Sequence, residues 1–91
     1  MSESIDIKLK RAAIALADKL SYPLAAENLE VSSAELRKQI STLEAQLYFH
    51  IFKPTQREVE LTEEGQFLIK AFRDSVALHD RNAGEDADET Q

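Results

Sequence analysis

The fold is decided by residues 23–47, PLAAENLEVSSAELRKQISTLEAQL. Pro23 fits the first turn of a helix, because it lacks a backbone N–H and its φ angle is already helical. We therefore expect a short helix over 23–29, whose buried side is formed by Leu24, Ala25 and Leu29. A tight connection over 30–32 follows, and Val31 is expected to fill the space between this helix and the next.

The next helix begins at a capping box. Ser32 and Glu35 match the pattern Ser-x-x-Glu, in which the serine hydroxyl accepts from the backbone N–H three residues on and the glutamate reaches back. We expect this helix to cover 33–47. Its apolar stripe consists of Leu36, Ile40, Leu43 and Leu47. The opposite face carries Ser33, Arg37, Lys38, Ser41 and Thr42.

The segments on either side complete the pattern. Steps of three and four residues predict a helix over 4–20, with an apolar stripe of Leu9, Ala12, Ala13, Leu16, Ala17 and Leu20. Beyond residue 47, β-favouring residues flank a polar turn at 53–57, which predicts two short strands, the second at 59–61. Thr62 then caps a helix over 63–82.

This order of elements is typical of a mainly α fold, the winged helix-turn-helix, with a two-stranded wing and a long C-terminal helix. We predict a winged helix-turn-helix domain over 1–62, a linker or dimerisation helix over 63–82 and an acidic, disordered tail over 83–91. In such folds the second helix of the pair enters the major groove of DNA. The helix over 33–47 is therefore the expected recognition helix.

The charge of the chain is unevenly distributed. The net charge of −6 at first disfavours a nucleic-acid partner. However, residues 1–58 carry eight Lys/Arg and eight Asp/Glu, whereas residues 59–91 carry three Lys/Arg and nine Asp/Glu. Because local charge decides where a polyanion docks, the neutral body remains compatible with DNA.

Several function classes are not supported. The 91 residues provide for one domain, without cysteine and without an apolar run that resembles a signal peptide or a membrane span, so we expect a cytoplasmic protein. His50 and His79 are isolated, which predicts no metal site. With only two glycines and no nucleophile–base pair in view, we expect neither a cofactor nor an enzyme.

A combination of short motifs is more specific. The stretches 25–32, AAENLEVS, and 59–65, VELTEEG, fall in register with Leu36, Gln39-Ile40, Leu43-Glu44, Leu47 and Phe52. In this combination residues 9–70 closely resemble the N-terminal DNA-binding domain of LysR-type transcriptional regulators. The resemblance implies a winged helix-turn-helix followed by a linker helix that pairs with its twin. The effector-sensing domain that normally follows is absent from the 91 residues, so control is expected to come from abundance or from a partner.

The chain departs from that family at several positions. Ser33-Ala34 stands where Gln-Pro is usual, Arg37-Lys38 where a Ser-Arg pair is common, and Tyr48 where a glycine usually follows the helix. Glu58 and Glu60 occupy wing positions that often carry arginine. These acids, together with Glu35, are expected to weaken phosphate contact.

The candidate DNA-binding residues are Ser32, Ser33, Arg37, Lys38, Gln39, Ser41, Lys53 and Arg57. Arg37 suits a guanine edge and Lys38 a phosphate, although two adjacent cations also suit a merely solvated helix face. The serines suit phosphates, but capping is the stronger role for Ser32. Gln39 either reads a base or bonds within its helix. Lys53 and Arg57 either meet DNA from the wing or belong to an ordinary exposed hairpin.

The last helix predicts self-association. The apolar residues of 67–78 cover more than one side of the helix, and a lone domain leaves one side unpaired. A symmetric dimer is the default closure. The residues assigned to this interface are Phe67, Ile69, Phe72 and Val76.

Two functions remain open. The first is a sequence-specific regulator that binds double-stranded DNA as a homodimer. The second is a protein-interaction module of the same fold, which binds or hetero-dimerises with another regulator instead of DNA. The acidic wing favours the second, and a gel shift at low salt separates the two.

Overall fold

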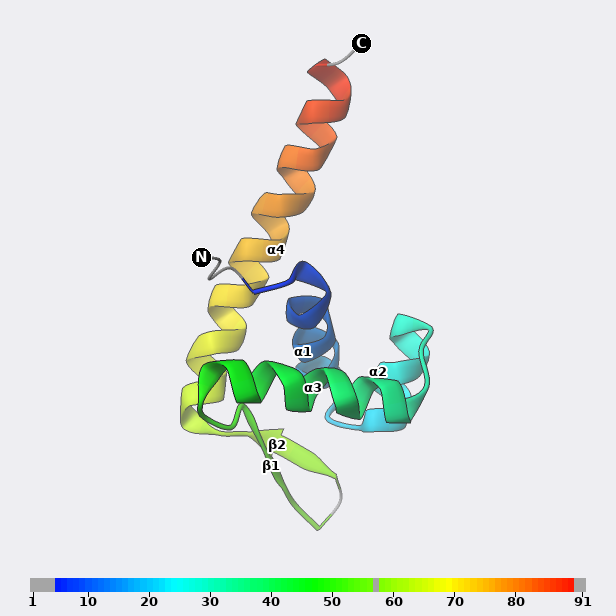
Figure 1. Ribbon diagram of the computed structural model, residues 1–91, viewed down its shortest axis with the longest axis vertical. Helices are drawn as coiled ribbons and strands as arrows, with labels where there is room; N and C mark the ends of the chain where they lie inside the picture. Colours follow the sequence, from blue (N-terminus) through cyan, green and yellow to red (C-terminus); the bar gives the residue numbers. More distant parts are fainter. Residues whose placement is uncertain (1–4, 57, 90–91) are drawn as a thin grey trace.

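The computed structural model describes residues 5–56 and 58–89. The elements follow the order α1 (Ile7–Lys19), α2 (Tyr22–Leu29), α3 (Ser33–Leu47), β1 (Phe52–Pro54), β2 (Val59–Leu61) and α4 (Glu63–Glu89). Figure 1 shows α3 lying across the body, the two-stranded wing below it, and α4 rising along one side well beyond the other helices. The predicted winged helix-turn-helix is confirmed, with three helices, an antiparallel wing and a long final helix.

The first helix begins later than expected. Asp6 is its N-cap, and the carboxylate accepts a hydrogen bond of 2.8 Å from the backbone N–H of Lys8. The helix therefore starts at Ile7 rather than at residue 4, which lies outside the described residues. It ends at Leu20, which adopts a left-handed conformation with φ of 53°.

The turn between α2 and α3 is also closed without glycine. Glu30 adopts a left-handed φ of 62°, and the N–H of Val31 bonds to the carbonyl of Ala26 at 3.0 Å. In α2 the small residues Ala25 and Ala26 are buried, which allows the helix backbone to approach its neighbours closely. Leu24, expected on the buried side, is instead 53% exposed, because the helix turns its alanine pair inward.

The predicted bounds of α3 match the structure. The Ser32 hydroxyl accepts from the backbone N–H of Glu35 at 3.0 Å, so the serine half of the capping box is formed. The Glu35 carboxylate bonds forward to Gln39 instead of back to the cap. The core side of α3 contributes Leu36, Ile40 and Leu43, all buried.

The wing is a short antiparallel hairpin. Phe52 pairs with Leu61 and Pro54 with Val59. The turn is held by two bonds between Thr55 and Glu58, one from N–H to carbonyl and one from N–H to hydroxyl. Ile51 and Phe52 are buried, so the base of the hairpin is fixed to the core.

The final helix starts where a glycine allows close approach. A Cβ on Gly65 would lie 2.2 Å from the carbonyl oxygen of Ile51, so only glycine fits in this turn. The helix continues past the predicted end at residue 82 to Glu89. The disordered tail predicted over 83–91 is therefore helical as far as Glu89, and residues 90–91 lie outside the described residues.

The first half of α4 packs against α1. Ile69 and Phe72 belong to the same hydrophobic core as Leu16 and Leu36, so this half is part of the globular unit despite the boundary predicted at residue 62. Among the described residues, no helix is both long and apolar enough to cross a membrane.

In the part of the chain that the structure describes, two ion pairs link α1 and α4. Arg73 bonds to Asp18 at 2.6 Å, and Arg11 bonds to both carboxylate oxygens of Asp80. The hydrogen bond to Arg11 holds the pKa of the Asp80 carboxyl below its ordinary value. The same bond raises the pKa of the Arg11 guanidinium. These pairs are exposed, so each adds little to stability, and α4 is held on α1 mainly by the shared core.

Candidate nucleic-acid interface

The outer face of α3 presents donors to solvent. Arg37, Lys38 and Ser41 are exposed. Lys38 and Ser41 lie on the side of the helix away from the buried stripe, whereas Arg37 lies on its flank, about 100° around the helix from the buried Leu36. A helix that is anchored on one face and exposes donors on the other is what major-groove reading requires.

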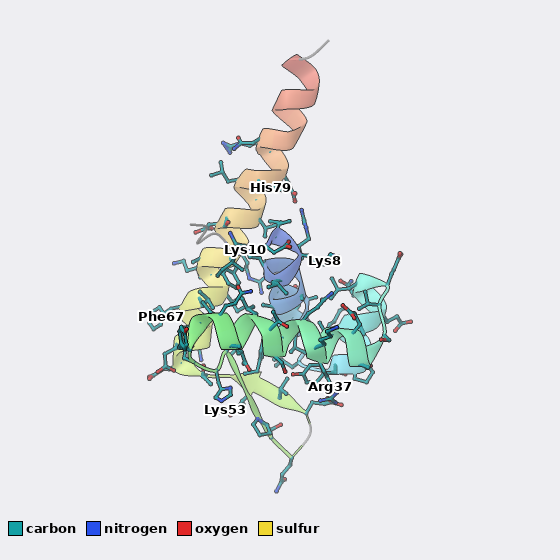
Figure 2. All side chains as sticks on the ribbon, viewed as in Figure 1. Lys8, Lys10, Arg37, Lys53, Phe67 and His79 are labelled. Carbon is teal, nitrogen blue, oxygen red and sulfur yellow. The ribbon has the colours of Figure 1, made fainter. Side chains whose placement is uncertain are left out.

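Arg37 lies on the flank of α3 that faces α2 and the wing. Its guanidinium carbon is 4.1 Å from the centre of the Tyr22 ring, which is a cation–π contact. Figure 2 shows Arg37 and Lys53 on the wing side of the molecule, whereas Lys8, Lys10 and His79 lie toward the other end. Burial raises the pKa of the Tyr22 hydroxyl, and the cation of Arg37 opposes that shift.

The remaining candidates on α3 play different parts. Ser32 is the N-cap, as the capping interpretation expects. Ser33 is half-buried. The side-chain amide of Gln39 donates to the Glu35 carboxylate at 3.1 Å. Of the two roles considered for Gln39, the structure therefore shows the bond within the helix. At 100° per residue, Gln39 lies about 200° around the helix from Arg37, so the two face opposite flanks.

The wing carries one cation that the structure describes. The Lys53 ammonium lies 3.3 Å from a carboxylate oxygen of Glu60 across the hairpin. Arg57 lies outside the described residues. Glu58 turns its carboxylate toward the start of α2, where it accepts from the backbone N–H of Tyr22 at 3.5 Å.

Between α2, α3 and the wing lies a hollow of about 230 Å³. Its lining includes Tyr22, Arg37, Glu44, Lys53 and Glu58. Three of the candidate elements therefore meet around one small depression. Lys38 and Ser41 lie outside it on the open face of α3.

Glu44 has a structural role that was not predicted from the sequence. Its carboxylate accepts from the backbone N–H groups of Ile51 at 2.7 Å and Phe52 at 3.1 Å, and it lies 3.2 Å from Nδ1 of His50. It thereby ties α3 to the first strand of the wing. The pair Leu43-Glu44 carries part of the resemblance, but no spacing in the sequence predicts these bonds.

Tyr22 was missed as well. It stands in the first turn of α2, half-buried against the core, and its ring supports Arg37. A residue one helix away from its partner leaves no spacing signal in the sequence. Only the angle between α2 and α3 brings the ring and the guanidinium together.

The assignment of the dimer residues is corrected by the structure. Ile69, Phe72 and Val76 are only 4%, 4% and 9% exposed, because they pack inward within one chain. Of the four assigned residues, Phe67 alone is accessible, at 78%. Leu78, at 54%, is the other large apolar side chain exposed on the described part of α4.

The part of the chain that the structure describes holds no group of three or more His, Cys, Asp or Glu side chains placed to share a metal ion.

Comparison with known proteins identifies the family. The sequence profile of the bacterial regulatory helix-turn-helix protein, lysR family, matches residues 7–66. An uncharacterized HTH-type transcriptional regulator in the ibpB-leuC intergenic region of Azotobacter vinelandii is 36% identical over 77 residues, which cover 84% of this chain and 54% of that protein. The chain thus spans about half the length of that relative.

Solved structures agree in fold. The CbnR DNA-binding domain in complex with DNA has a TM-score of 0.89 at 24% identity, over 96% of this chain and 100% of that one. The BenM DNA-binding domain bound to benA site 1 DNA has a TM-score of 0.89 at 22% identity, over 96% and 98%. The match over residues 7–66 shows that this chain belongs to the LysR family, as a helix-turn-helix DNA-binding domain in a family of transcriptional regulators rather than enzymes.

Proposed function

We propose that this chain binds double-stranded DNA sequence-specifically as a dimer and regulates transcription in the cytoplasm, with α3 as the major-groove reading helix. The observation that carries the proposal is the exposed face of Arg37, Lys38 and Ser41 on the second helix of a helix-turn-helix. The two solved relatives described above were crystallised with DNA, which supports the same use of the fold.

The residues have separate roles in this proposal. Arg37 donates to a base edge, since its planar guanidinium matches the two acceptors of guanine. Lys38 and Ser41 contact phosphates and set the position of the helix. Lys53 meets the backbone from the wing after leaving Glu60, an exchange that costs little because the pair is exposed.

Self-association through α4 uses a stripe that differs from the one first assigned. Phe67, Ala71 and Leu78 are exposed, at spacings of four and seven residues, and so lie along one side of the helix. Asp74 falls on the same side between them. A second copy of α4 is the proposed cover for this stripe, since closed pairs are the commonest symmetric assembly.

The first test is binding to a random pool of duplex DNA, followed by a gel shift with the selected site. Arg37→Glu is expected to abolish the shift while the circular dichroism spectrum stays unchanged. Lys8→Glu makes the same charge change on α1, away from the wing, and is expected to retain binding (Figure 2). Unchanged binding of Arg37→Glu would remove the assigned reading face.

The second test concerns the dimer. Phe67→Ser with Leu78→Ser is expected to shift the mass in sedimentation from dimer to monomer. Leu24→Ser removes an equally exposed leucine from α2 and is the matched control, which is expected to stay dimeric. A wild-type chain that sediments as a monomer at every concentration would contradict the dimer.

The alternative is a protein-interaction module that pairs with another regulator through α4. The observation that favours it is the acidic wing, in which Glu60 neutralises Lys53 and Glu58 faces α2. If no duplex is retarded at about 50 mM salt, where phosphate contacts are strong, this alternative gains. Mixed dimers with a full-length LysR-type regulator, detected by mass, would then establish it.

A further inference from the structure

The Tyr22–Arg37 contact is a specific feature of the interface. The guanidinium carbon lies 4.1 Å from the ring centre, so Arg37 is stacked on the ring rather than extended alone into solvent. Within the described residues, Arg37 forms no ion pair with a carboxylate, although Glu44 and Glu58 line the same hollow. The ring is thus the partner that fixes the position of the cation.

The geometry points to Tyr22 as a specificity-determining positioning residue, whose ring presets Arg37 to read one guanine. This inference rests on the proposed function, because it assigns a base to the reading face of α3. Tyr22 acts through Arg37 and is not itself expected to touch the base.

The ring is held firmly enough to serve as a platform. Tyr22 stands at the start of α2, directly after the Ser21 cap, and packs against the hydrophobic core. Its backbone N–H points to the Glu58 carboxylate of the wing at 3.5 Å. The backbone of Tyr22 is therefore bounded by the helix cap on one side and by the wing on the other.

The contact with the ring leaves the N–H donors of Arg37 without a protein acceptor among the described residues. A ring against one face of a guanidinium does not use the N–H donors, which lie in the guanidinium plane and point outward. Those donors are the ones that form the bidentate pair with N7 and O6 of guanine. Because an unrestrained arginine loses rotamer freedom on binding, a stacked one is better prepared for a single orientation.

A purely structural explanation of the contact makes a different prediction. If Arg37 only covers the Tyr22 ring, loss of the ring lowers stability or affinity for every sequence alike. If the ring presets the reading geometry, its loss lowers the preference at one base position. Positional preference is therefore the readout that separates the two.

The experiment selects bound sites from a random duplex pool with the wild-type chain and with Tyr22→Leu, Tyr22→Phe and Arg37→Gln. Arg37→Gln is expected to reduce the preference for guanine at one position by roughly five- to one-hundredfold. Tyr22→Leu is expected to reduce preference at that same position by roughly two- to fivefold, the range of an exposed cation–π contact. Tyr22→Phe keeps the ring and is expected to keep the preference.

Two controls make the result decisive. Lys38→Gln is expected to weaken all sequences together, because a phosphate contact carries no base information. In the Arg37→Gln background, Tyr22→Leu is expected to have no further effect on the selected sequence. The inference is overturned if the two substitutions act at different positions, if their effects add, or if Tyr22→Phe loses as much preference as Tyr22→Leu.

A second measurement tests the stack without DNA. In a Tyr48→Phe background Tyr22 is the only phenol, and its ionisation is followed by ultraviolet absorbance. The cation of Arg37 lowers the Tyr22 pKa, whereas burial and the carboxylates of Glu44 and Glu58 raise it. Arg37→Gln is therefore expected to raise the Tyr22 pKa, and an unchanged pKa would show that the stack is absent in solution.

The DNA selection and the Tyr22 titration test different parts of the inference. If the wild-type pool shows no enrichment while the phenol titration behaves as expected, the stack exists but the DNA-binding function is wrong, and the reading role falls with it. If the pool is enriched but the titration is unchanged, the proposed function stands and the role of Tyr22 is wrong.

Discussion

Removal of the Glu44 carboxylate is expected to loosen the wing from α3. The carboxylate accepts from the backbone N–H groups of Ile51 and Phe52, and its side chain is only 15% exposed. Hydrogen bonds to a charged acceptor contribute about 1.5–3 kcal/mol each. Since both bonds end on one oxygen at the edge of the core, we expect Glu44→Ala to cost roughly 2–4 kcal/mol.

Glu44→Gln is the informative comparison. The amide oxygen can accept from the same two N–H groups, so only the charge is lost, and the expected cost is about 1 kcal/mol. His50→Ala removes the third contact, which is exposed, and is expected to cost no more than about 0.5 kcal/mol. The predicted order of stability is therefore wild type, His50→Ala, Glu44→Gln and Glu44→Ala.

The assay is thermal unfolding followed by circular dichroism. In a domain of this size 1 kcal/mol shifts Tm by about 4–8 °C, so Glu44→Ala is expected to melt about 10 °C or more below the wild type. A shift of less than about 4 °C for Glu44→Ala would show that the carboxylate does not hold the wing, because it corresponds to less than a single hydrogen bond. Equal losses for Glu44→Ala and Glu44→Gln would refute it in another way, by showing that the oxygen is not the acceptor that matters.

Three further predictions concern stability. Gly65→Ala is expected to cost about 1–3 kcal/mol, because the new Cβ would meet the Ile51 carbonyl and push the first turn of α4 outward; a melting curve equal to that of the wild type would contradict this. Glu30→Gly is expected to add about 0.5–1 kcal/mol, since glycine adopts the left-handed φ without strain, whereas Glu27→Gly inside α2 is the control and should lose a similar amount. The Asp80 pKa lies below its ordinary value, so the bond with Arg11 contributes stability above that ordinary value and loses it as the pH falls through the lowered pKa. Arg11→Gln is therefore expected to flatten the acid limb of the stability–pH curve, and identical limbs would show that the pair is inactive in solution.

Local signals in the sequence were sufficient for much of the fold. The bounds of α3 followed from the Ser32 cap and from an apolar stripe that ends at Leu47. The strand at Val59–Leu61 followed from alternation after a polar turn. Each of these features depends on residues within one or two turns of each other, which is why the sequence reveals them.

The features that the sequence did not reveal depend on contacts between elements. The apolar residues of α4 could not be divided between core and dimer without knowing which side α1 covers, so Ile69 and Phe72 were assigned to the wrong surface. The bonds of Glu44 and the ring of Tyr22 depend on how the wing and α2 meet α3. The periodicity of a helix or strand carries no information about such contacts between elements.

The packing of α4 against α1 has a consequence for operator geometry. The first helix contacts α2, α3 and α4 at once, and the apolar core that it shares with α4, assisted by the pairs at Asp18 and Asp80, holds α4 in place. In two chains paired along α4, the two α3 helices would then be held at a fixed separation. A fixed separation requires a fixed spacing of the two half-sites along the duplex. Insertion of half a helical turn of DNA between them is therefore expected to abolish binding of the dimer, even when every base of each half-site is kept.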